Sequence, residues 1–163
     1  MSIAQELSSL FRRDLSRLLK QIEAFPDDET LWHTRPEVTN SAGNLTLHIE
    51  GNLREFIGRQ LGKIDYSRTR DLEFSSKGVS RQELIKRVAE LKLAIPSVIA
   101  GLSSPELEAE YPEIVLERAT STQELLIHLY GHLNWHLGQI DYLRRIITDG
   151  TAVKAVGLEP VSK

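Results

Sequence analysis

The sequence contains no cysteine. This absence excludes disulfide bonds, a cysteine nucleophile, thiolate zinc sites and cysteine-bound iron–sulfur clusters. It also suits a reducing compartment. The first residues, MSIAQELSSLFRRDL, carry charges every few positions and lack the apolar stretch of a signal peptide. Together these features predict a cytoplasmic protein.

Long hydrophobic runs and an excess of positive charge are missing as well. No window approaches the roughly 18 consecutive apolar residues that a membrane-spanning helix requires. The formal net charge is -3, and no basic cluster with interleaved aromatic residues is present. We therefore expect neither a membrane nor a nucleic acid as a partner.

Four long segments carry apolar residues three and four positions apart, the spacing of amphipathic helices. Ser80 and Ser121 each stand three residues before a glutamate, which indicates a capping box at a helix start. The four segments cover residues 1–25, 42–61, 81–102 and 121–150. No segment reads as a convincing strand, and 163 residues suit one domain. The sequence predicts an all-α four-helix bundle over residues 1–150 and a tail over residues 151–163.

The connector between the second and third segments, residues 62–78, is polar and has no helical period. Its 17 residues are more than a turn between antiparallel neighbours needs. This length predicts a crossover, after which the third helix starts back at the other end of the bundle.

The last helix carries three histidines, each one turn after the previous one: His128, His132 and His136. His132 and His136 share the arc of the apolar residues, and His128 lies at its edge. Two histidines four positions apart stand about 6 Å apart along a helix, close enough to reach one metal ion. The alternative is that they are core histidines whose ring nitrogens bond to Asn, Gln or backbone carbonyls.

A third metal ligand must come from elsewhere in the chain. Leu129 and Leu133 occupy the position where a zinc protease helix carries its general-base glutamate, so that signature is absent. His48 lies on the second helix, at the flank of its apolar arc, and is the natural third ligand. Asn52, one turn later, would orient the His48 ring. By itself, His48 also suits a hydrogen-bonded residue at the core boundary.

The stretch His132-Leu-Asn-Trp-His136-Leu-Gly-Gln139, near the end of a four-helix chain, resembles the DinB family of metal-binding bundles, which includes bacillithiol-transferase-like proteins. The single His48 in NLTLHIEGNL and the connector that carries Trp32 agree with this resemblance, which spans nearly the whole chain. The resemblance implies an up-down-down-up bundle, usually a homodimer, with one zinc or nickel ion held by three histidines.

Carried onto this sequence, the resemblance implies His48, His132 and His136 as the metal ligands. Gln139 matches a frequent family glutamine and would orient a ligand or pack beside it. His128 has no required family role, and its edge position places it beside the ligands or at the surface.

Three neutral imidazoles with an open fourth position are what a catalytic metal site needs. Because the chain has no cysteine, a low-molecular-weight thiol would have to arrive as substrate or cofactor. This suits a metal-dependent thiol S-transferase acting on small molecules, and equally a water-activating hydrolase. One alternative is a non-catalytic metal-binding or stress-related bundle that acts through binding or dimer contacts, and another is a plain helical bundle. For the homodimer, apolar residues at the helix rims predict an interface: Leu47, Ile57, Ile127 and Leu137.

Overall fold

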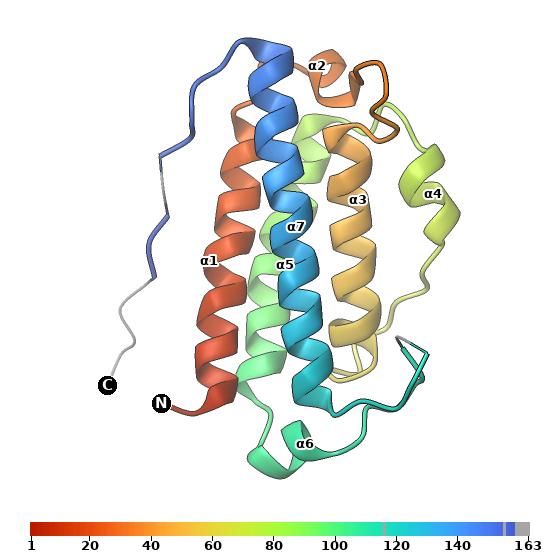
Figure 1. Ribbon diagram of the computed structural model, residues 1–163, viewed down its shortest axis with the longest axis vertical. Helices are drawn as coiled ribbons and strands as arrows, with labels where there is room; N and C mark the ends of the chain where they lie inside the picture. Colours follow the sequence, from red (N-terminus) through yellow and green to blue (C-terminus); the bar gives the residue numbers. More distant parts are fainter. Residues whose placement is uncertain (116, 155, 159–163) are drawn as a thin grey trace.

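Four long helices dominate the computed structural model, which describes residues 1–115, 117–154 and 156–158. They lie side by side along the long axis of the molecule (Figure 1). Their bounds are Ile3–Glu23 (α1), Ala42–Leu53 (α3), Arg81–Ala100 (α5) and Thr122–Thr148 (α7), and α3 continues into a π-helix, Arg54–Arg59 (η1). The described part of the chain contains no strand, only two isolated β-bridges. The all-α prediction is confirmed.

The long helices begin where the sequence predicts because their starts are set by local hydrogen bonds. The side chains of Ser2, Ser41, Ser80 and Ser121 each accept the backbone N–H three residues later. At the end of α7, Asp149 rather than Gly150 takes the left-handed backbone conformation, with φ of 50°.

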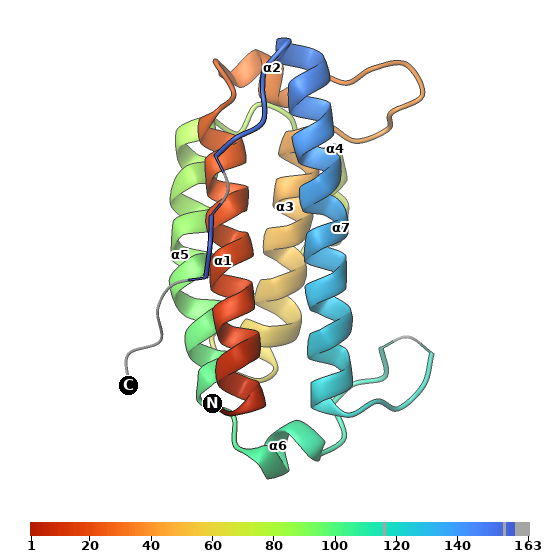
Figure 2. The ribbon, with the colours of Figure 1, turned by 60° about the vertical axis from the view of Figure 1, so that its left-hand side comes forward.

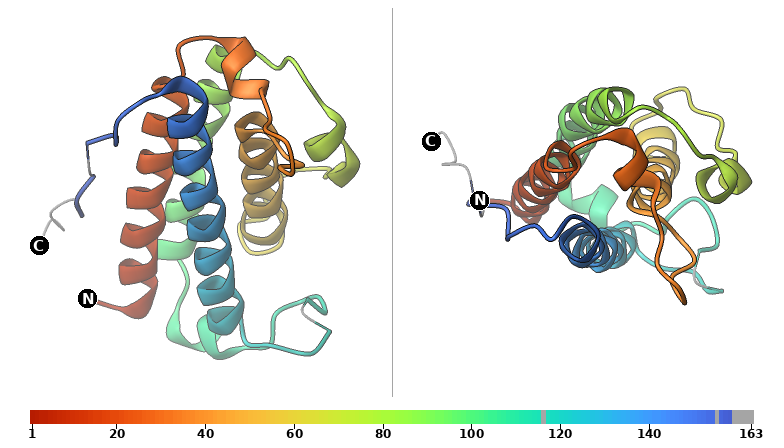
Figure 3. Two further views of the ribbon diagram at one scale, coloured as in Figure 1. Left: turned by 45° about the horizontal axis from the view of Figure 1, so that its top comes forward. Right: turned by 90° about the horizontal axis from the view of Figure 1, so that it is seen from above.

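The helices pack as a square in which α1 and α3 each contact both α5 and α7 (Figure 3). In Figure 1, α1 and α7 run upward while α3 and α5 run downward. Residues 62–78 carry the chain from the lower end of η1 back to the upper end of α5. The largest fully buried side chains come from several helices and include Phe11, Leu15, Leu53, Leu91 and Ile95.

Three short helices in the connectors were not predicted: Asp28–Trp32 (α2), Arg70–Ser75 (α4) and Ser104–Glu108 (α6). With five or six residues, they are too short to show a hydrophobic period. The helix α4 packs on the outer side of α3 (Figure 1). Because α2, α5 and α7 also pack against α3, all 12 of its residues are buried.

The structure corrects the predicted rim residues. Leu47 on α3, Ile57 on η1 and Leu137 on α7 are buried, and of the four only Ile127 is exposed, with 53% of its surface accessible. These buried apolar residues at the rim of a helix therefore pack against connectors and neighbouring helices. The periodicity of a single helix does not reveal such contacts.

Residues 151–154 and 156–158 leave α7 and run back beside α1 (Figure 2). Arg17 of α1 donates two hydrogen bonds to the Val156 carbonyl at 3.0 and 3.2 Å, and Arg144 donates one to the Thr151 carbonyl at 2.8 Å. Residues 155 and 159–163 of the predicted tail lie outside the described residues. None of the helices described is both long enough and apolar enough to cross a membrane.

Candidate metal centre

Three histidines from two helices meet between α3 and α7. The Nε2 atom of His132 lies 3.2 Å from Nε2 of His48 and 3.0 Å from Nε2 of His136. One ring nitrogen from each of the three lies within 4.8 Å of the others. Nitrogens bound tetrahedrally to zinc at about 2.0–2.1 Å stand roughly 3.4 Å apart. The spacing therefore suits three ligands of one ion.

Two of the rings are oriented by acceptors on their outer nitrogens. His48 Nδ1 donates to Glu73 Oε2 at 2.8 Å, and His136 Nδ1 donates to Gln139 Oε1 at 2.7 Å. With the proton on Nδ1, the Nε2 lone pair of each ring faces the cluster. His132 Nε2 lies between these two lone pairs and can donate a proton to only one of them. A cation would satisfy all three nitrogens, so the donor set fits a divalent metal.

The electrostatics also favour neutral rings. Burial, with the neighbouring His136 and His48, lowers the pKa of His132 to about 4. Burial and the proximity of His48 likewise lower the pKa of His136. At neutral pH these two rings are therefore uncharged, which is the state in which imidazole binds a metal.

Glu73 is the site residue that the sequence analysis missed. It comes from α4, 25 residues after His48, and is buried against α3. Arg68 donates to both of its oxygens, at 2.7 and 2.9 Å. Burial alone would raise the pKa of Glu73, but the hydrogen bonds from His48 and Arg68 lower it. No local pattern marks this glutamate, because it lies in a connector without a period.

The other predicted neighbours lie as follows. Gln139 contacts His136 as described. The His128 ring stacks near that of His132 with centroids 6.5 Å apart, but His128 is exposed and does not contribute a nitrogen to the cluster. Asn52 does not take the predicted role: its buried Oδ1 finds no hydrogen-bond partner in the described residues. Glu73 already occupies the one outer nitrogen of His48, and this corrects the expectation for Asn52.

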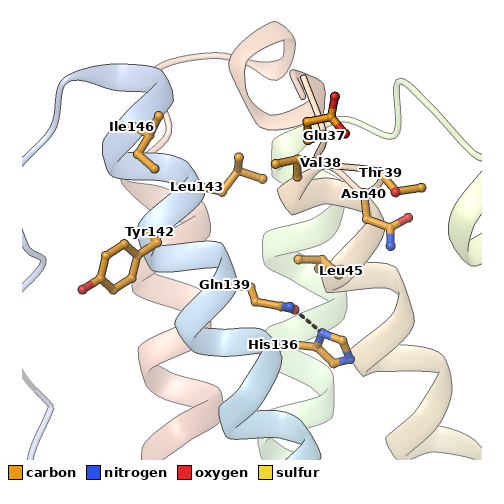
Figure 4. Close-up of a pocket in the computed structure, with 10 residues that line it drawn as sticks. All are labelled: Glu37, Val38, Thr39, Asn40, Leu45, His136, Gln139, Tyr142, Leu143 and Ile146. Carbon is orange, nitrogen blue, oxygen red and sulfur yellow. Dashed lines mark hydrogen bonds between the residues drawn. The ribbon is translucent and has the colours of Figure 1, made fainter. Parts of the chain in front are cut away.

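A cavity of about 490 Å³ opens beside the cluster (Figure 4). His136 and Gln139 form one part of its wall. The other lining residues come from the connector before α3, from α3 and from α7: Glu37, Val38, Thr39, Asn40, Leu45, Tyr142, Leu143 and Ile146. A small molecule in this cavity would therefore lie against one of the three histidines.

The sequence was compared with models of known protein families. Residues 3–156 match the model of a family described as a protein of unknown function, DUF1572. The chain belongs to the DUF1572 family. This family is DinB-like, so the resemblance predicted from the histidine pattern is confirmed.

Two solved structures share the fold of this DUF1572 chain. A DinB-like protein from Bacillus cereus aligns with a TM-score of 0.64 and 15% identity, covering 92% of this chain and 91% of the other. A conserved protein from Enterococcus faecalis aligns with a TM-score of 0.73 and 15% identity, covering 92% and 99%. A comparison with curated proteins found no match. At 15% identity, these two structural matches support only the fold of the DUF1572 chain. Its function has to be inferred from the geometry of the site.

Proposed function

We propose that this protein binds one divalent metal ion through the Nε2 atoms of His48, His132 and His136. The observation that carries the proposal is the convergence of three imidazoles, two of which are oriented by Glu73 and Gln139. We infer that the four long helices form one up-down-down-up bundle over residues 1–150, and that this bundle brings α3 and α7 together. We also infer that the protein works in the cytoplasm. Zinc and nickel both suit imidazole ligands, and the ligand type does not discriminate between them.

We further propose that the site acts on a small thiol. When bound, a divalent ion lowers the pKa of a thiol or water molecule held beside it. The chain's own residues hold the three nitrogens in place and shape the cavity beside His136. That cavity, of about 490 Å³, falls in the range of small-molecule sites. Because the chain has no cysteine, the thiol comes from a bound molecule, as in a thiol S-transferase.

The test of this function begins with the metal content of protein purified without a histidine tag or chelator, for which we expect about one equivalent. Cobalt-loaded protein is then titrated with 2-mercaptoethanol. A new charge-transfer absorption band, absent from metal-free protein, is the expected result. Metal binding without any spectral change on adding thiol would contradict the thiol chemistry while preserving the metal site.

A non-catalytic metal-binding role is the second candidate, and one observation favours it. Both oxygens of Glu73, the carboxylate in contact with the cluster, are engaged by Arg68 and His48. Glu73 is therefore not free to act as a general base. A protein that binds metal and thiol but transfers no thiol to any of several electrophiles would support this binding role.

We also propose that the protein is a homodimer that pairs through α7. Four large apolar residues on α7 are exposed: Ile127, Trp135, Tyr142 and Ile146. At 100° per residue they fall within an arc of about 100°, which makes a continuous apolar stripe. Such exposed stripes mark contact surfaces in soluble proteins.

Light scattering should give the wild type a mass of about twice 18.4 kDa, because two copies would cover this stripe. Trp135→Glu should halve that mass, since it places a charge in the contact. Leu93→Glu is the control, as Leu93 is similarly exposed but lies on α5. A monomeric wild type would contradict the dimer.

A further inference from the structure

The crossover segment, residues 62–78, holds one side of the candidate metal centre. Its helix α4 touches His48 twice. Glu73 Oε2 accepts the hydrogen bond from Nδ1, and the Phe74 ring packs against the imidazole with centroids 4.9 Å apart. His48 is therefore positioned by a connector as well as by its own helix.

The Glu73 carboxylate has partners in both elements. Arg68, from the crossover segment itself, binds it with two hydrogen bonds, and His48, from α3, supplies a third. A buried carboxylate is stable only while such partners are present. If the crossover segment left α3, Arg68 and Glu73 could move into water together, whereas His48 would lose the acceptor that fixes its ring.

The surface of α3 is shaped to receive this segment. Asn44 Nδ2 lies 3.0–3.1 Å from three carbonyl oxygens at the end of α4, those of Glu73, Phe74 and Ser76. Gly51 leaves room for the carboxylate, because a Cβ atom there would stand 2.1 Å from Glu73 Oε1. Asn44 and Gly51, which lie one turn before and one turn after His48 on α3, thus form the surface on which α4 packs.

We propose that Glu73 is a positioning residue for His48, so that metal binding and the docking of the crossover segment stabilise each other. This inference rests on the proposed metal site. A carboxylate on Nδ1 keeps the proton there, directs the Nε2 lone pair toward the metal and makes it more basic. A segment that improves metal affinity is itself stabilised by the metal to the same extent, because such coupling is reciprocal.

The first experiment measures Zn²⁺ affinity by competition with a chelating dye. Glu73→Gln and Gly51→Ala should each weaken binding by about 10–100-fold, the usual effect of losing a group that orients a metal ligand. The matched control is Gly131→Ala, a glycine of α7 next to His132 where an added Cβ meets nothing within 4 Å. It should bind Zn²⁺ as the wild type does.

A further variant covers the case in which Gly51→Ala fails to fold. Asn44→Asp keeps the oxygen that accepts from Ser41 but replaces the donor facing the three carbonyls with a second acceptor. It leaves the three histidines and Glu73 unchanged. We expect it to weaken Zn²⁺ binding in the same direction.

The second experiment measures amide hydrogen exchange over residues 66–78 with and without Zn²⁺. In the wild type, Zn²⁺ should slow amide exchange by the same factor by which undocking of the crossover segment weakens Zn²⁺ binding. In His132→Ala, Zn²⁺ should not slow exchange. A wild type that binds Zn²⁺ with unchanged exchange, or variants that bind it as tightly as the wild type, would overturn the role of Glu73. A wild type that binds no metal would instead refute the metal site itself.

Discussion

His132→Ala should lose the metal almost completely, from about one equivalent in the wild type to near none. In the proposed site His132 would be the central ligand, because its Nε2 lies within 3.2 Å of the corresponding atoms of both other histidines. Its removal leaves two nitrogens on different helices, which form a much weaker site. Elemental analysis of the two proteins, purified in parallel, provides the measurement.

The same substitution should remove the stabilisation that the metal provides. An ion present at 100 times its dissociation constant stabilises the folded state by about 2.7 kcal/mol. Added Zn²⁺ should therefore raise the melting temperature of the wild type and leave that of His132→Ala unchanged.

His128→Ala is the control for this experiment. His128 lies on the same helix and stacks near the His132 ring, but it is exposed and stands outside the cluster of converging nitrogens. It should keep its metal. Metal retained by His132→Ala would refute the site, and metal lost from both variants would bring His128 into it.

Asp14→Ala should lower the free energy of unfolding by about 3 kcal/mol. Asp14 lies on α1 with a fully buried carboxylate, which Arg13 binds at 2.8 and 2.9 Å, Arg17 at 2.9 Å and the Tyr130 hydroxyl of α7 at 2.7 Å. This loss of stability lies at the lower end of the range for breaking a buried charge pair. Both arginines are partly exposed and can be solvated by water once Asp14 is removed. Urea unfolding at pH 7 measures it.

Tyr130→Phe serves as the comparison for Asp14, since it keeps the ring but removes the hydroxyl, which donates to the carboxylate and accepts from Arg13. It should cost about 1.5 kcal/mol, the lower end for a hydrogen bond to a charged group. A loss in Tyr130→Phe as large as that in Asp14→Ala would show that the Tyr130 hydroxyl, rather than the two arginines, carries the stabilising effect of the Asp14 carboxylate.

The contribution of Asp14 should also depend on pH. Burial alone would raise its pKa, but the hydrogen bonds from Arg13 and Tyr130 outweigh burial and lower it. The ordinary pKa of an aspartate is about 3.9. The stabilisation is therefore complete above that value and is lost as the pH falls through the lower folded pKa. The stability difference between wild type and Asp14→Asn should shrink below about pH 4.

The long helices were predictable because their signals are local. A cap such as Ser80 is satisfied by the backbone N–H three residues later, and the apolar spacing repeats within a single helix. The three converging histidines were predictable for a similar reason. His132 and His136 lie one turn apart on the apolar arc of one helix, and His48 stands at the flank of another.

The groups around the three histidines were not predictable in the same way. Glu73 stands 25 residues from the ring that it orients, in a connector without a period. Asn52 was expected in its place because it lies one turn from His48, but Glu73 approaches from outside α3, where a residue of the same helix does not reach. Leu47 was expected at the surface and is buried because α4 covers that side of α3.

The sequence by itself determined the all-α class, the starts of the four long helices and the histidines that face inward, since each follows from contacts within a few residues. Only the tertiary structure decided that three Nε2 atoms meet between α3 and α7, and that the crossover brings a buried carboxylate to His48. The reason is physical. These contacts join residues 25 and 84 positions apart, and their geometry depends on how helices and connectors pack together.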